Sequence, residues 1–158
     1  MLSGLFIGVS SAFVGGCATQ CPSTTMTLVL QASDRLNPDD RGRALATVVR
    51  VYQLKSAVKM EGAGFEDVWL HANETLQGDL LKTDEFTLFP RGKMDFHLRL
   101  DKETAFVVAV ALFRRPGGAS WRSIYEVPQR KCGLFRSPPP VARRFLLQDY
   151  RIEARSER

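Results

Sequence analysis

The chain has 158 residues, a formal net charge of +5, 44% hydrophobic residues and 25% charged residues. These proportions are ordinary for a globular protein, and they exclude a disordered or low-complexity chain. The basic balance is spread over many short segments and predicts a solvated surface, with an acidic partner or an anionic membrane face as the alternative.

The N-terminal residues favour export. Residues 5–17, LFIGVSSAFVGGC, carry no charge and end in two glycines and a cysteine. An apolar run of about 7–15 residues followed by small residues is typical of a bacterial secretory signal, and it is shorter than the ~20 residues of a membrane-spanning helix. A buried N-terminal helix or strand is the other interpretation, but a core helix would carry polar residues along one face.

The segment VGGC at residues 14–17 resembles a lipobox, in which small residues precede a cysteine that accepts a diacylglyceryl group. It departs from that pattern at Val14, where Leu is usual, and no Lys or Arg precedes the apolar run. We therefore expect a signal peptide at 1–16, a tether lipidated on Cys17 at 17–24, and one domain at 25–158. Ala18 stands where an Asp would direct retention in the inner membrane, so the expected location is the inner leaflet of the outer membrane. Stable anchoring takes more than one acyl chain, which a triacylated Cys17 would carry.

Two further cysteines, Cys21 and Cys132, lie in the expected mature chain. An even pair in an oxidising compartment is a candidate disulfide. Two separate thiols are the alternative, because the sequence does not give the distance between them.

Most of the predicted elements after residue 24 are short strands, identified by alternating polarity or by β-branched and aromatic content. The predicted strands are residues 26–32, 46–55, 86–89, 94–100, 105–113, 121–127 and 145–154. The last of them loses its alternation near Gln148, where a β-bulge would fit. One helix is predicted at 65–76 from the helical spacing of Phe65, Val68, Trp69, Ala72 and Leu76.

Turn formers separate these elements. Residues 33–43 are rich in charge and in turn-forming residues, which predicts an exposed loop, and residues 114–119 form a hairpin-type loop. Residues 128–143, with three consecutive prolines, form a long irregular connection. About seven short strands and one added helix predict an all-β, two-sheet sandwich.

Signals of catalysis are weak. The two histidines, His71 and His97, lack partners at metal-ligand spacing apart from Asp95, and they are expected on the surface. The sequence contains no nucleotide-binding or nucleophile motif, and the acidic pair Asp84–Glu85 is expected in a solvated turn. We therefore predict no enzyme, no metal and no cofactor. A basic rim is the alternative to a solvated sheet edge for Arg114, Arg115, Arg130, Lys131, Arg136, Arg143 and Arg144.

Several motifs, in this order behind the lipobox, resemble those of the type VI secretion lipoprotein family TssJ. They are LNPD at 36–39 with Gly42–Arg43, RVYQLK at 50–55, DEFTLFP at 84–90, FVVAV at 106–110 with Phe113–Arg114, and Trp121–Arg122. The resemblance covers roughly residues 14–127, and the last thirty residues match only as a strand. It implies a transthyretin-like sandwich with an added helix, in a lipoprotein of the trans-envelope secretion complex. The implied partner is the periplasmic C-terminal domain of TssM, which joins TssL in the inner membrane.

In that family the loop after the first strand contacts the partner, and residues 33–43 occupy its place here. Its polar contacts and small apolar anchors would come from Asp34, Arg35, Leu36, Asn37, Pro38, Asp39 and Arg41. Leu36 is the one sizeable apolar side chain of the loop, so we expect it to be exposed and to dock on the partner. The competing interpretation is that these residues only satisfy turn geometry, as Asn37–Pro38 and Gly42 partly do.

Two other functions remain open. A hydroxyisourate hydrolase on the same scaffold would need convergent His and Arg residues and a Tyr-Arg-Gly-Ser-like C-terminus. This chain instead ends in Tyr150-Arg-Ile-Glu153 and five further residues. A generic periplasmic lipoprotein that binds a small ligand would need a large apolar pocket.

Overall fold

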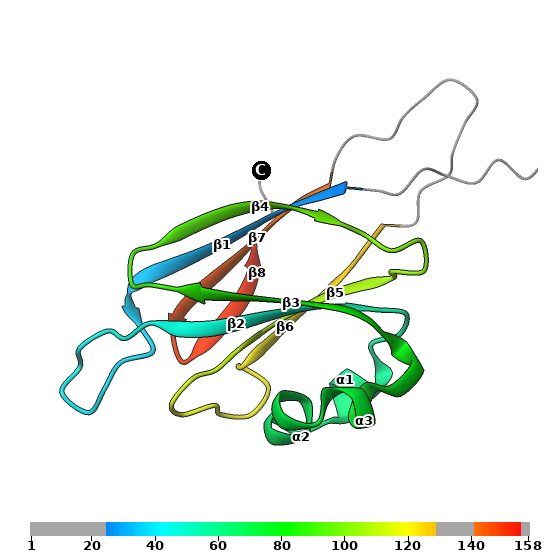
Figure 1. The fold of residues 1–158 in the computed structure, drawn as a ribbon. Helices are drawn as coiled ribbons and strands as arrows, with labels where there is room; N and C mark the ends of the chain where they lie inside the picture. The colour runs from blue at the N-terminus through cyan, green and yellow to red at the C-terminus, as the bar shows by residue number, and fades with distance from the viewer. Residues whose placement is uncertain (1–24, 129–140, 156–158) are drawn as a thin grey trace, which may run out of the picture.

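The computed structural model describes residues 25–128 and 141–155, which fold as two four-stranded sheets (Figure 1). Sheet A has the order β4-β1-β7-β8 and consists of β1 (Thr25–Leu36), β4 (Lys93–Arg99), β7 (Val141–Asp149) and β8 (Arg151–Arg155). Sheet B has the order β3-β2-β5-β6 and consists of β2 (Thr47–Leu54), β3 (Leu80–Leu88), β5 (Phe106–Ala111) and β6 (Arg122–Glu126). The predicted all-β sandwich is confirmed. Strands β1 and β7 pair in parallel, and every other pair that the structure describes is antiparallel.

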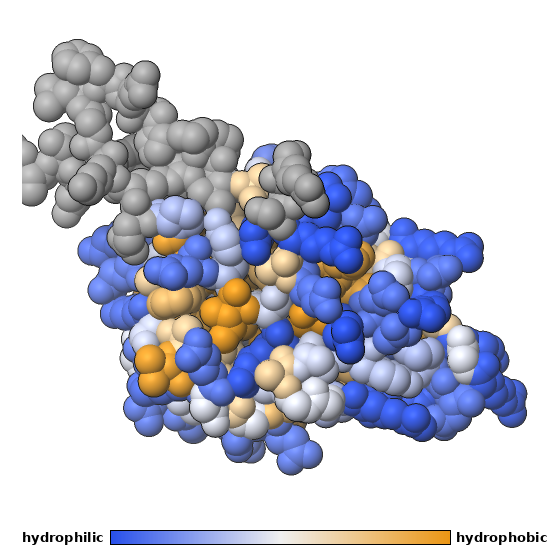
Figure 2. All heavy atoms as spheres, turned by 180° about the vertical axis from the view of Figure 1, so that it is seen from behind, coloured by the Kyte–Doolittle hydropathy of each residue, from blue (hydrophilic) through white to orange (hydrophobic). Residues whose placement is uncertain are grey.

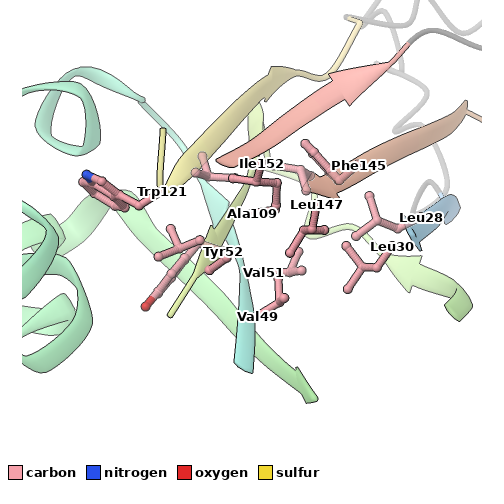
Figure 3. Packing of buried hydrophobic residues seen from close by; sticks show 14 of the residues in the cluster. Leu28, Leu30, Val49, Val51, Tyr52, Ala109, Trp121, Phe145, Leu147 and Ile152 are labelled. Atoms are coloured by element: carbon pink, nitrogen blue, oxygen red, sulfur yellow. The ribbon is translucent and has the colours of Figure 1, made fainter. Parts of the chain in front are cut away.

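The inner faces of the two sheets form one hydrophobic core, shown in Figure 3. Sheet A contributes Leu28, Leu30 and Phe145, and sheet B contributes Val49 and Val51, all fully buried. Strand β5 is apolar on both faces because the two faces of sheet B are both covered. Its inner face meets sheet A, and helical residues including Met60, Val68 and Leu76 join the same cluster from the other side.

The helical segment between β2 and β3 is not the single helix predicted. It consists of α1 (Val58–Gly62), α2 (Phe65–Leu70), α3 (Ala72–Leu76) and a 3-10 turn η1 (Gln77–Asp79). The backbone leaves the helical region at Ala63 and Gly64, which are extended, and at His71, with φ −130° and ψ 40°. Each break changes the direction of the chain between two short helices. The spacing of the apolar residues alone does not reveal these breaks.

Three strand boundaries also differ from the prediction. Strand β1 continues to Leu36, beyond the predicted end at residue 32. Strand β3 begins at Leu80, although its outer residues are too polar to alternate clearly. The predicted last strand is two strands, because Asp149, with φ 52°, turns the chain back into β8 where a bulge had been expected.

The strand directions give the sandwich two distinct ends. We call the first the loop end: it carries residues 37–46, 89–92, 112–121 and 150, which connect β1–β2, β3–β4, β5–β6 and β7–β8. The second, the tether end, carries the start of β1, the β4–β5 loop and the end of β8 (Figure 1). Seen from behind, most of the surface is hydrophilic, and apolar residues gather in a band near the middle (Figure 2).

Candidate partner-binding surface

Leu36 corrects the prediction for the first loop. It is the last residue of β1, its side chain is fully buried, and it belongs to the core cluster. The pairing of β1 with β7 shifts between Ala32 and Leu36, and Leu36 then pairs with Asp149. This irregularity exposes Asp34 and Arg35 and returns Leu36 to the interior. The expectation that Leu36 is an exposed docking side chain is therefore wrong.

Asn37 begins the loop and is also buried. Its φ of 45° lies in the left-handed region, which Asn tolerates better than most residues. Its backbone N–H donates to the carbonyl of Asp149 at 2.8 Å, and its Oδ1 accepts from the backbone N–H of Arg114 at 2.8 Å. One side chain thus joins the β1–β2 loop to the β5–β6 loop.

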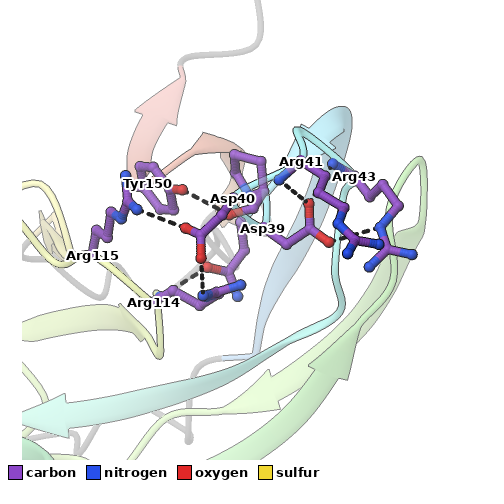
Figure 4. A network of polar contacts seen from close by, with 9 residues as sticks. Asp39, Asp40, Arg41, Arg43, Arg114, Arg115 and Tyr150 are labelled. Atoms are coloured by element: carbon purple, nitrogen blue, oxygen red, sulfur yellow. Dashed lines mark hydrogen bonds and ion pairs between the residues drawn. The ribbon is translucent and has the colours of Figure 1, made fainter.

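Asp39 organises the tip of the loop (Figure 4). Its Oδ1 accepts from the backbone N–H groups of Arg41 and Arg43 at 2.9 and 2.8 Å, and its Oδ2 accepts from Arg43 Nε at 2.7 Å. The bond from the Arg43 backbone is the main reason that the pKa of Asp39 is lowered from its ordinary value of 3.8, and partial burial opposes it. The carboxylate is therefore already engaged within its own loop.

Asp40 projects from this tip and meets two arginines of the β5–β6 loop (Figure 4). Its Oδ1 is 2.6 Å from Arg115 and its Oδ2 is 3.4 Å from Arg114. All three side chains are exposed, so each ion pair is weak in isolation. Asp40 is not among the residues predicted for partner contact. The adjacent acidic pair 39–40 and the adjacent basic pair 114–115 were the signal available, but only the fold brings them together.

The turn between β7 and β8 completes the surface. The Tyr150 hydroxyl donates to the carbonyl of Pro38 at 2.7 Å, and Ser120 Oγ donates to the carbonyl of Tyr150 at 3.1 Å. Three connections from both sheets are thereby held together by hydrogen bonds before any partner arrives. Of the residues predicted for partner contact, Asp34, Arg35 and Arg41 are exposed, Pro38 is partly buried, and Asn37 and Asp39 shape the loop.

The remaining candidate features are the two histidines, a metal site, a membrane-spanning helix and the cysteines. His71 and His97 are exposed, and Thr27 Oγ1 lies 3.3 Å from His97 Nδ1. Within residues 25–128 and 141–155 no group of three His, Cys, Asp or Glu side chains could hold a metal ion. None of the helices in those ranges is long and apolar enough to cross a membrane. Cys17, Cys21 and Cys132 lie outside the described residues, as do Arg130, Lys131 and Arg136.

The chain was compared with known proteins. A family model described as type VI secretion lipoprotein, VasD, EvfM, TssJ, VC_A0113 matches residues 24–156. The T6SS lipoprotein TssJ1 from Pseudomonas aeruginosa is 28% identical, with a TM-score of 0.73 over 87% of this chain and 100% of that one. No curated protein matches the chain.

Two further solved structures share the fold. Serratia marcescens Lip, a membrane-bound component of the type VI secretion system, is 18% identical with a TM-score of 0.75, over 87% of this chain and 99% of that one. A chain from a structure described as the T6SS protein TssM C-terminal domain from EAEC is 21% identical with a TM-score of 0.69, over 84% and 98%. Because the family model covers most of the chain, the protein belongs to the TssJ family of type VI secretion lipoproteins.

Proposed function

We propose that this protein anchors the trans-envelope complex of a type VI secretion system to the outer membrane. Acylated Cys17 holds it in the inner leaflet, and the domain faces the periplasm. There it binds the C-terminal domain of a TssM-like partner, which connects it to TssL in the inner membrane. Membership of the family supports the lipoprotein role, and the uncharged run ending in Val-Gly-Gly-Cys supports the lipid anchor.

The main support for the partner site is the set of hydrogen bonds and ion pairs that join three loops at the loop end. A surface that is ordered before binding loses less conformational entropy when the partner docks. Asp40, Arg41 and Arg115 are among its exposed charged members, whereas Leu36, Asn37 and Asp39 fix the loop positions from beneath. The partner contact is therefore a composite of the β1–β2 and β5–β6 loops, and its side chains are mostly polar. The similarity to a chain from the TssM C-terminal domain structure supports the choice of partner.

A small-ligand carrier on a transthyretin-like scaffold is less well supported. The structure has a depression of 410 Å³ on sheet A, lined by Arg35, Leu146, Gln148, Asp149, Arg151, Glu153 and Arg155. Ligand pockets are usually apolar with few polar groups, and this depression is lined mainly by charged side chains. Its composition suits surface solvation better than the capture of an apolar ligand.

The partner site is tested by titrating the mature protein against the purified TssM-like C-terminal domain. Deletion of residues 33–43 would remove Leu36 from the core, so point variants are the sharper test. We expect Arg41→Glu/Arg115→Glu to weaken binding at least about tenfold, the effect of losing one central polar contact. Arg99→Glu/Arg155→Glu changes the charge equally at the tether end and should leave the affinity unchanged. Equal affinities for both variants and the parent protein would place the interface elsewhere.

A further inference from the structure

The outer face of sheet A is rich in basic side chains. Residues on this face alternate with the core residues of the same strands. Its cations, contributed by all four strands, are Arg35, Lys93, Arg99, Arg144, Arg151 and Arg155. The face also carries His97.

The carboxylates on this face are already neutralised. Asp95 pairs with Lys93 at 3.0 Å, Glu153 with Arg151 at 3.5 Å, and Asp149 with Arg35 at 3.0 Å. Arg99 and Arg155 are exposed and have no ionic partner among the residues that the structure describes. The excess positive charge therefore lies toward the ends of β4 and β8.

The strand register places these charges toward the same end of sheet A, on its two edge strands β4 and β8. Arg155 stands directly opposite Arg144 on the neighbouring strand, and Arg144 pairs in turn with Val29. Arg99 is paired with Thr25, the first residue of the fold. We call His97, Arg99 and Arg155 the basic patch.

The basic patch lies at the tether end, where the chain leaves toward Cys17. Seven residues lie between Cys17 and Thr25, and the eight Cα–Cα steps that join these two residues span at most about 29 Å when fully extended. A lipid on Cys17 would therefore keep this end of the domain close to the membrane surface. The loop end lies at the opposite end of the same strands (Figure 1).

We propose that the basic patch binds the phosphate groups of anionic phospholipids in the membrane to which the protein is anchored. The contact holds the tether end against the surface and directs the loop end toward the periplasm, where the partner domain approaches. Basic side chains next to an anionic leaflet gain an attraction that falls off within a Debye length. The orienting role rests on the lipid anchor proposed above, but the lipid contact itself does not need the acyl chains.

The experiment uses the mature chain, residues 17–158, carrying Cys17→Ser so that no acyl chain contributes. Every residue of the core cluster lies between Met26 and Ile152, so this chain keeps the described fold complete. Co-flotation is measured with vesicles of phosphatidylcholine alone and with vesicles that also contain phosphatidylglycerol. We expect binding only to the anionic vesicles, and loss of binding at high salt.

Charge reversal then locates the contact. Arg99→Glu/Arg155→Glu should reduce the partition coefficient on anionic vesicles at least about tenfold, since each basic residue near such a surface contributes measurably. Arg91→Glu/Arg114→Glu makes the same change in net charge at the loop end and should reduce it far less. An equal reduction by both pairs would show that only net charge matters and would overturn the proposal.

Binding to neutral vesicles, or binding that survives high salt, would also overturn it. Failure of the Cys17 anchor would be seen separately, in the membrane fractionation of the acylated protein. The two proposals can therefore fail independently.

Discussion

Two neighbouring residues, Leu36 and Asn37, decide the shape of the candidate surface from inside it. Leu36 fills the core at the end of β1, and Asn37 bonds two loops through one amide side chain. Both lie in a stretch of charged and turn-forming residues whose composition predicts solvent exposure. Because both are buried, we expect substitutions at these positions to lower the stability of the fold. Any change in affinity for the partner would be a consequence of that loss of stability.

Leu36→Ala should lower the free energy of unfolding by about 2–5 kcal/mol, the range for emptying a fully buried leucine site. Arg41→Ala, five residues away and exposed, should change it by less than about 0.5 kcal/mol. Urea unfolding of both variants measures the difference. A Leu36→Ala protein as stable as the parent would mean that this side chain does not support the core.

Asp39 makes a pH-dependent contribution to stability. Its pKa is lowered in the folded protein, so the ionised carboxylate is the form that the fold prefers. The contribution is complete above the unfolded value near 3.8 and is lost as the pH falls through the lower folded pKa. Asp39→Asn should therefore be less stable than the parent at about pH 7, and the gap should narrow at about pH 3. Unfolding curves at both pH values test this, and a gap that widens in acid would contradict it.

At the scale of elements, two arginines fasten the helical segment to sheet B. Arg50 Nε bonds Glu85 at 2.8 Å, its NH1 donates to the carbonyl of Trp69 at 2.6 Å, and its guanidinium lies 4.0 Å from the Trp69 ring centre. Arg122 donates to the carbonyl of Ala63 at 2.8 Å, and burial lowers its pKa while Glu61 opposes that shift. Short helices are marginal alone, so these contacts and the buried apolar residues hold the segment in place.

Arg50→Lys should cost about 1–3 kcal/mol of unfolding free energy, since hydrogen bonds to a charged group are lost. Lysine cannot replace them, because it lacks the planar group that stacks on Trp69 and bonds two partners at once. Arg99→Lys is the matched control at an exposed site. Hydrogen exchange of residues 65–76 should be faster in Arg50→Lys only. Unchanged exchange there would mean that the apolar contacts alone hold the helices.

At the scale of the molecule, the strand directions separate the two proposed contacts. The membrane contact belongs to the tether end and the partner contact to the loop end, with the length of the sandwich between them (Figure 1). Protein interiors are close-packed and deform little, so the two-sheet core should keep the two contacts at a fixed separation.

Cys17→Ser should move the protein from the membrane fraction to the soluble periplasmic fraction, since no acyl chain would then hold it. Metabolic labelling with a radioactive fatty acid checks the site directly. Cys21→Ser, a second cysteine four residues away, serves as the control and should keep the label. Label that persists in Cys17→Ser would contradict the assignment of the lipidated residue.

The sequence by itself determined the family, the all-β class and most of the strands, because those depend on ordered motifs, local composition and apolar periodicity. Strand β5 and strand β4 were recognisable for that reason, and the exposed position of both histidines followed from the same patterns. Only the tertiary structure decided that Leu36 is core and that Asp40 meets Arg114 and Arg115. The first depends on an irregular pairing with β7, and the second on loops separated by 74 and 75 residues. Both are contacts between distant segments, and no local pattern in one segment records where the other will lie.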